Sequence, residues 1–169
     1  MKIIHPIMKI NKNKIFLFAF SLLISFLPGI IGSLFTVKAI ENWYVYLNKP
    51  IFNPPNWIFS PVWILLYILI GISFYLILVK KPKIDQQNFN VIIFLFTCHL
   101  VLNASWSIFF FNFHDILTAY INILCLDLVI FLCIIKFYKV SKIAGLLFVP
   151  YLIWILFATY LNLSIFLLN

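Results

Sequence analysis

The chain alternates between long apolar stretches and short segments that carry lysine or proline. Five stretches are each long enough to cross the roughly 30 Å hydrocarbon core as a helix of about 20 residues. They are apolar on all sides, whereas a helix of a soluble bundle keeps one polar face. The pattern predicts an all-α integral membrane protein, a five-helix transmembrane bundle in one domain spanning 1–169. The helices are expected near 15–37, 58–79, 91–111, 116–135 and 143–168, with a long first loop over 38–57.

Composition supports this class. The chain is 65% hydrophobic and 9% charged, with a mean hydropathy of +1.13, far from the soluble average of about a quarter charged. A cleaved signal peptide is an alternative for the first span, but a signal's apolar region covers only roughly 7 to 15 residues. The first span also carries Ser21, Ser25, Gly29 and Ser33 at i+4 spacing. Such a small-residue stripe allows close helix approach, either inside the bundle or in a dimer.

The net charge of +8 comes from lysines alone, since all twelve basic residues are Lys. They follow the loops and form no compact patch, so nucleic-acid binding is not expected. With helices in up-down order, ten lysines fall on one side and only Lys38 and Lys49 on the other. By the positive-inside rule, the N-terminus, Lys2 and Lys9 included, is cytoplasmic and the first loop lies outside, in a membrane expected to be a bacterial plasma membrane.

Signatures of soluble enzymes and of metal sites are missing from the sequence. There is no P-loop, GxGxxG, HExxH or Gly-x-Ser-x-Gly pattern. Cys98, Cys125 and Cys133 lie within apolar spans without CxxC spacing, so they predict neither a disulfide framework nor a zinc site.

Aromatic and polar residues recur on three of the predicted helices. Trp63 and Tyr67 share one face of the second span. The third span carries His99, Asn103 and Ser107 at i, i+4 and i+8 beside Trp106, and the fifth carries Trp154, Ala158 and Leu161 on one face. Two interpretations stay open: a small-molecule pocket with flat apolar walls, or interfacial aromatic residues with ordinary helix packing.

Three motifs in order carry a family resemblance. The first runs through Trp43-Tyr44, Lys49-Pro50, Pro54-Pro55, Trp57, Pro61-Val62-Trp63 and Leu66-Tyr67. The second is Leu102-Asn103, Trp106 and Phe110-Phe111, and the third is Pro150-Tyr151-Leu152, Trp154, Phe157-Ala158 and Leu161-Asn162. Together they resemble the TspO family, also called tryptophan-rich sensory proteins and, in mitochondria, the translocator protein or peripheral benzodiazepine receptor.

The resemblance implies a homodimeric five-helix bundle whose cavity binds porphyrins, either protoporphyrin IX or haem, as ligands, with no required cofactor or metal and with membrane lipid around it. The implied cavity residues are Tyr44, Pro50, Trp63, Tyr67, Asn103, Trp106, Ser107, Trp154, Ala158 and Leu161. Lys49 or Lys38 would pair with propionates at the mouth.

Some features depart from the family pattern. Tyr160 is followed by no basic residue, which weakens a sterol motif. His99 is a candidate axial ligand or a helix-packing residue. Asp127, near the centre of the fourth span, is expected to be neutral or hydrogen-bonded, with His99 or a dimer-related polar group as partner.

Two function classes follow from these residues. The first is a tetrapyrrole-binding sensor, receptor or transporter. The second is light-dependent porphyrin breakdown, with Trp63 and Trp154 as candidate catalytic residues. A lipid- or sterol-binding or purely structural membrane protein is the weaker alternative.

Overall fold

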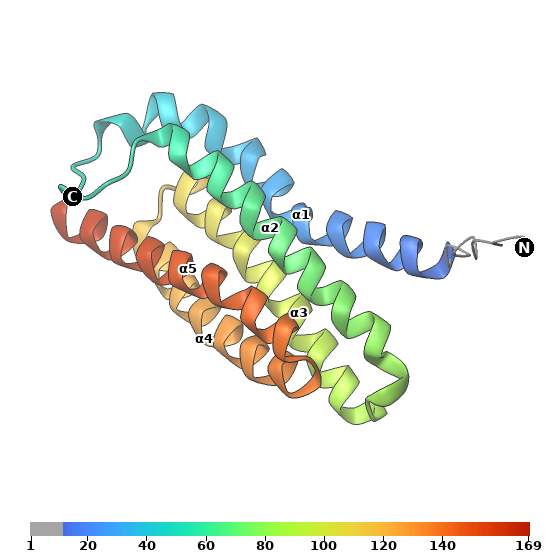
Figure 1. Cartoon of the computed structure of the whole chain (residues 1–169). Helices are drawn as coiled ribbons and strands as arrows, with labels where there is room; N and C mark the ends of the chain where they lie inside the picture. The colour runs from blue at the N-terminus through green and yellow to red at the C-terminus, as the bar shows by residue number, and fades with distance from the viewer. Residues whose placement is uncertain (1–11) are drawn as a thin grey trace, which may run out of the picture.

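The computed structural model describes residues 12–169 and consists of five long helices with short connections (Figure 1). Each helix is long and apolar enough to cross a membrane, so the chain is an integral membrane protein and the predicted all-α class is confirmed. The long helices are α1 (Lys12–Asn42), α2 (Asn56–Lys80), α3 (Gln86–Ser107), α4 (Ile116–Val140) and α5 (Lys142–Leu168). Short helical turns are η1 (Tyr44–Tyr46), η2 (Lys81–Lys83) and the π-helical η3 (Ile108–Asn112).

Every predicted span lies within one of these helices, α3 being continued by η3. The predicted first loop was too long, because residues 38–42 are helical and α2 already begins at Asn56. Hydropathy marks where the apolar run stops at Lys38, but a helix can continue into the headgroup region, where charged side chains are solvated.

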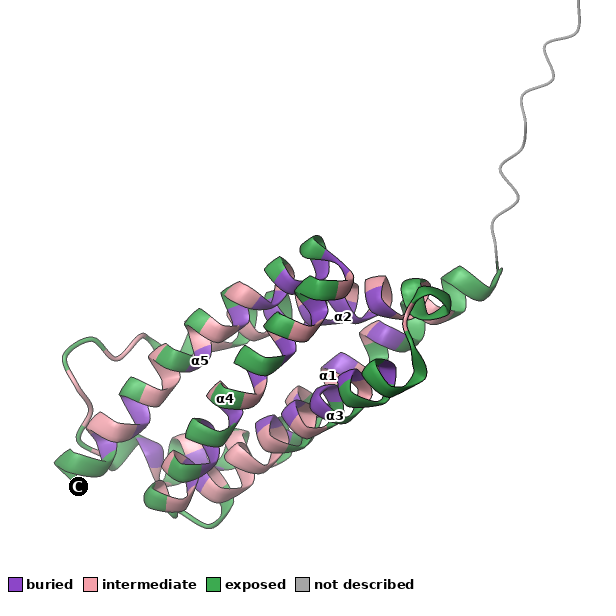
Figure 2. Cartoon of the chain, turned by 90° about the horizontal axis from the view of Figure 1, so that it is seen from below, coloured by how far each residue is buried: buried purple, intermediate pink, exposed green. Residues whose placement is uncertain are grey.

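The helices form a closed ring. α1 packs against α2 and α3, α5 packs against α2 and α4, and α3 meets α4. The start of α1 and the end of α5 lie at opposite ends of the bundle (Figure 1). Buried positions face the middle of the ring and exposed positions face outward (Figure 2). Since the outward positions include many large apolar side chains, the outer surface suits lipid.

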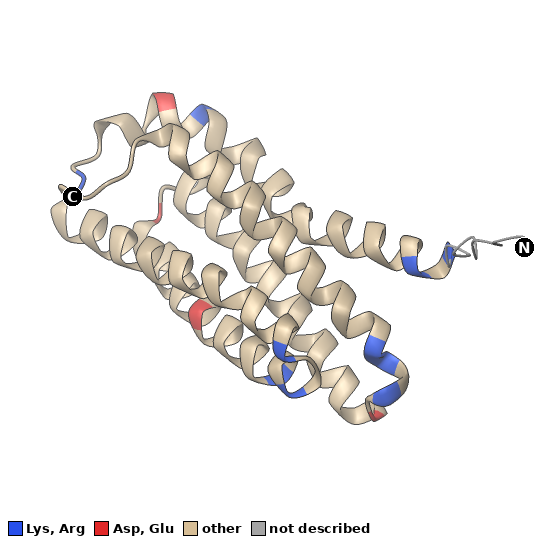
Figure 3. Ribbon diagram, in the orientation of Figure 1, with Lys and Arg blue, Asp and Glu red and all other residues tan. Residues whose placement is uncertain are grey.

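Most lysines gather at one end of the bundle, where α2 connects to α3 and α4 to α5 (Figure 3). Lys38 and Lys49 belong to the opposite end. Lys2 and Lys9, which were assigned to the lysine-rich side from the sequence, lie outside the described residues.

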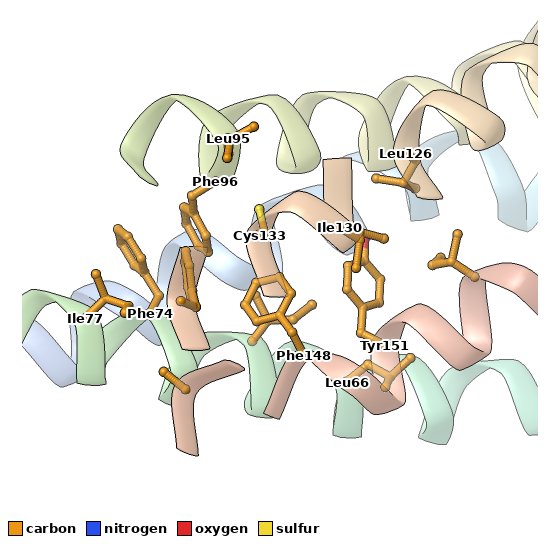
Figure 4. Close-up of a cluster of buried hydrophobic side chains, with 14 of the residues drawn as sticks. Leu66, Phe74, Ile77, Leu95, Phe96, Leu126, Ile130, Cys133, Phe148 and Tyr151 are labelled. Atoms are coloured by element: carbon orange, nitrogen blue, oxygen red, sulfur yellow. The ribbon is translucent and has the colours of Figure 1, made fainter. Parts of the chain in front are cut away.

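The half of the bundle nearest this lysine-rich end is tightly packed (Figure 4). Phe74 of α2 and Phe96 of α3 stack with ring centroids 3.8 Å apart, and Phe137, Phe148 and Tyr151 have no exposed surface. Aromatic rings of this size bury large areas and fill the ring of helices at this level.

The small-residue stripe of α1 packs inside the bundle along most of its length. Ser21 and Ser25 are fully buried, and the Ser25 hydroxyl donates a 2.8 Å hydrogen bond to the Tyr67 carbonyl of α2. A Cβ at Gly29 would collide with the Tyr67 ring. Ser33 is exposed on the helix and bonds only to its own Ile30 carbonyl. The intramolecular packing prediction is therefore confirmed for the first three positions.

Candidate functional site

A cavity of about 470 Å³ occupies the half of the bundle away from the lysine-rich end. All five long helices, together with Tyr44 and η3, contribute to its walls. This volume lies within the range of small-molecule sites, roughly 300 to 1,000 Å³. The packed core described above forms its floor.

One wall of the cavity is aromatic. Trp63 and Tyr67, one turn apart on α2, stack with centroids 5.3 Å apart and an interplanar angle of 26°. Phe59, one turn earlier, meets the Trp154 ring of α5 edge-on at 5.8 Å. The i, i+4, i+8 spacing places all three α2 rings on one face. The result is a flat, apolar surface facing the cavity.

Polar side chains form a hydrogen-bonded layer at the floor. The Tyr67 hydroxyl donates to Asn103 Oδ1 at 3.2 Å, and Asn103 Nδ2 donates to the Tyr151 hydroxyl at 2.7 Å. The three residues come from α2, α3 and α5. These bonds fix the Asn103 amide and tie three helices together.

A second polar pair lies higher in the cavity. Trp106 Nε1 donates to Asn162 Oδ1 at 2.9 Å, and Asn162 Nδ2 donates to the Ile116 carbonyl at 3.0 Å. The indole N–H of Trp154, by contrast, is buried and has no hydrogen-bond partner among residues 12–169. A ligand acceptor would satisfy this donor.

Between α1 and α2, Tyr44 lines the cavity. Tyr44 is buried against Phe110 and Phe111, and its hydroxyl donates to Asn53 Oδ1 at 3.0 Å. Burial raises the pKa of Tyr44, and the Asn53 hydrogen bond partly offsets this. The Lys49 ammonium lies 4.6 Å from the centroid of the Tyr44 ring. Its partial burial lowers the pKa of Lys49.

The structure brings nine of the ten sequence-predicted residues around the cavity. These are Tyr44, Trp63, Tyr67, Asn103, Trp106, Ser107, Trp154, Ala158 and Leu161. Pro50 is the exception: it lies in the loop beyond η1, where its carbonyl accepts the Asn53 N–H at 3.0 Å, and it is not a lining residue. Whether the nine bind a ligand stays a prediction.

Several lining residues were missed by sequence reasoning. The second half of α1 contributes Gly29, Gly32, Ser33 and Thr36. A Cβ at Gly32 would lie 2.7 Å from Ser107 Oγ, so this glycine lets α1 approach α3 closely. The signal was the cluster of small residues after Pro28, which from the sequence indicated helix packing alone.

His99 lies outside the cavity lining. It is 1% exposed, and its ring is surrounded by Phe96, Phe148 and Tyr151. Within the described residues, neither ring nitrogen has a hydrogen-bond partner. The structure therefore places His99 in the packed core, one helical turn from Asn103.

Asp127 is hydrogen-bonded, as predicted, but to a different partner. Its Oδ2 accepts a 2.8 Å hydrogen bond from Thr159 Oγ1 of α5. His99 was the expected partner within the chain, and that expectation was wrong because α4 turns Asp127 toward α5. The sequence analysis did not name Thr159, whose hydroxyl also donates to the Ile155 carbonyl of its own helix.

Comparison with known proteins gives consistent matches. The model of the TspO/MBR family matches residues 20–168. The tryptophan-rich protein TspO of Archaeoglobus fulgidus is 43% identical over 141 residues, covering 83% of this chain and 89% of the relative. That of Chlorobaculum tepidum is 42% identical over 141 residues, covering 83% and 88%. The human translocator protein is 33% identical over 132 residues, covering 78% of each chain.

Proposed function

This chain belongs to the TspO/MBR family, and from that membership and its cavity we propose that it is a membrane receptor, sensor or transporter for a tetrapyrrole, protoporphyrin IX or haem. The observation that carries the proposal is the flat aromatic wall of Trp63 and Tyr67, which Phe59 extends to the Trp154 ring of α5. Planar macrocycles gain both apolar burial and ring stacking against such surfaces.

The polar groups suit the rest of such a ligand. The Asn103 amide at the floor and the Trp154 N–H, which has no partner within residues 12–169, offer hydrogen bonds within otherwise apolar walls. The Lys49 ammonium lies against the ring of Tyr44, which lines the cavity. An ammonium group there would pair with propionate carboxylates, which would remain near water.

Titration with protoporphyrin IX, followed by its absorption band, tests the proposal. Trp63→Ala should weaken binding roughly tenfold or more, because it removes a stacking ring from the wall. Trp57→Ala is the matched control, since Trp57 is 72% exposed and does not line the cavity. Equal affinity of the two variants would contradict the proposed site.

Light-dependent breakdown of the porphyrin is a second candidate function. The Trp63 ring contacts both Tyr67, at 5.3 Å, and Tyr151, at 6.3 Å, so an oxidised tryptophan would have two electron-donating neighbours. Illumination in air should then bleach the porphyrin and give a product of higher mass, with dioxygen as oxidant. Loss of this product in Trp63→Phe or Trp154→Phe would support chemistry, and reversible quenching alone would support binding only.

We also propose a homodimer in a bacterial-type plasma membrane with the N-terminus in the cytoplasm. The orientation rests on the lysines at one end of the bundle (Figure 3), and the dimer on family resemblance. A reporter fused after Asn169 should be inactive if it works only in the cytoplasm. Cross-linking in membranes should give a dimer, and a purely monomeric product would contradict it.

A further inference from the structure

We propose that a second site, at the lysine-rich end of the bundle, binds the phosphate headgroup of an anionic phospholipid. A cleft of about 360 Å³ lies there between the ends of α2 and α4, η2 and the start of α3. Lys80, Lys83, Lys136 and Lys139 line it, together with Asp85 and Asn88. None of them lines the aromatic cavity, so the inference does not depend on the proposed function.

The cleft carries excess positive charge. Four lysines face one carboxylate, and that carboxylate is already engaged: Asp85 Oδ1 accepts the Asn88 N–H at 2.9 Å and Oδ2 accepts from Asn88 Nδ2 at 2.7 Å. The side-chain bond from Asn88, followed by the backbone bond, keeps the pKa of Asp85 below its ordinary value. Asp85 therefore stays ionised as the cap of α3 and is not paired with a lysine of the described chain.

Within residues 12–169, three of the four ammonium groups are unpaired. The Lys80 ammonium donates to the Val140 carbonyl at 3.2 Å, which ties the end of α2 to the end of α4. Across the described chain, Lys83, Lys136 and Lys139 make neither an ion pair nor a hydrogen bond. Like charges converging on one cleft repel one another, and a bound anion would remove that repulsion.

The position of the cleft favours a lipid over a soluble anion. Lys80 and Val140 are the last residues of α2 and α4, so the cleft lies where the spans end and lipid headgroups begin. Leu132 and Ile135, one turn before Lys136 and Lys139, are each 37% exposed. They give acyl chains an apolar path directly below the charged groups, and basic pockets of this kind hold anionic headgroups.

The test uses the purified full chain in neutral detergent, with thermal unfolding as readout. The probes are short-chain phosphatidylglycerol, phosphatidylcholine with the same chains, and inorganic phosphate. Phosphatidylglycerol should raise the melting temperature in a saturable way. The other two should be at least about tenfold weaker, since one has no net charge and the other lacks acyl chains.

Matched variants separate the cleft from general charge. Lys83→Gln/Lys136→Gln/Lys139→Gln removes the unpaired lysines of the cleft and leaves Lys80 in place. Lys12→Gln/Lys81→Gln/Lys142→Gln removes the same charge from the same end of the bundle, outside the lining. The first variant should bind phosphatidylglycerol on the order of 100-fold more weakly than the chain itself, at about fivefold for each of its three lysines. The second variant should bind it within about threefold of the chain itself.

Three results would overturn the proposal. They are equal losses in the two triple variants, equal binding of phosphatidylcholine, and binding of inorganic phosphate as tight as that of phosphatidylglycerol, which would indicate a site for soluble phosphate. Should the triple variant fail to fold, Lys136→Gln against Lys142→Gln gives the same comparison. A loss of about fivefold confined to Lys136→Gln supports the cleft, and equal affinities contradict it.

Discussion

The hydrogen-bonded layer at the cavity floor makes Asn103 the most informative position for mutation. Asn103→Ala removes the bonds to Tyr67 and Tyr151, whose side chains are 6% and 0% exposed. An interhelical hydrogen bond in a membrane contributes about 0.6 kcal/mol on average and about 1.7 at most. Both tyrosine hydroxyls would also be left buried without a partner, so we expect a loss of about 2 to 3 kcal/mol in the free energy of unfolding.

Unfolding in mixed detergent micelles measures this loss, and Asn122→Ala provides the control. Asn122 is also buried and makes one interhelical bond, from its Nδ2 to Ser105 Oγ at 2.8 Å, but it does not line the cavity. Its truncation should cost about 1 kcal/mol and leave the affinity for protoporphyrin IX unchanged. Asn103→Ala should weaken that affinity as well.

A double-mutant cycle provides the refutation. If the Tyr67 hydroxyl matters through Asn103, then Tyr67→Phe should be destabilising in the original chain and nearly neutral in the Asn103→Ala background. Equal effects of Tyr67→Phe in the two backgrounds would show that the bond contributes nothing. If Asn103→Ala lowers the free energy of unfolding no more than Asn122→Ala does, the hydrogen-bonded layer likewise has no special role in stability.

Three further predictions concern other parts of the chain. Gly145→Ala should lower the free energy of unfolding by about 1 to 3 kcal/mol, because the added Cβ would lie 2.8 Å from both Cα and N of Tyr138. A free energy of unfolding in detergent micelles equal to that of the original chain would contradict this. Asp127→Asn should change stability by less than about 0.5 kcal/mol and leave porphyrin affinity unchanged, since it keeps a hydrogen-bond acceptor toward α5; lost binding in a folded variant would add Asp127 to the site. The depressed pKa of Asp85 means that its stabilising effect is present above about pH 4 and lost as pH falls through the lower folded-state value. Asp85→Ala should therefore reduce the loss in the free energy of unfolding as the pH is lowered below about 4. The same pH dependence in the variant and the original chain would contradict a stabilising role of the ionised Asp85.

The helices and much of the cavity were predictable because each rests on local spacing. Apolar length alone located the spans. The i+4 spacing of Trp63 and Tyr67 placed both rings on one side of α2, and the same logic placed Asn103 and Ser107 on one side of α3. The polar stripe of α3 indicated one face that avoids lipid, but the choice between a ligand cavity and ordinary helix packing needed the family resemblance.

The parts that could not be predicted depend on contacts between helices. Pro50 belongs to a loop whose path no periodicity fixes, and it lies outside the lining. The partner of Asp127 depends on the rotation of α4 relative to α5, which sequence spacing leaves open. For the same reason the basic cleft could not be foreseen: Lys83 and Lys136 are far apart in the sequence and meet only because α2 and α4 end at the same level.

The division of the bundle into a packed half and a hollow half has a functional consequence. Large rings such as Phe96 and Phe148 fill the helix ring at the lysine-rich end, whereas the cavity occupies the other end, where the small side chain of Ala158 of α5 is among the lining residues. The Tyr67–Asn103–Tyr151 layer lies at the boundary and belongs to both. A ligand that fills the cavity must therefore rest on groups that also hold three helices together. Stability and binding should change together at this layer and separately above it, where Trp63 contributes its ring to the cavity wall without bridging helices of the described chain by a hydrogen bond.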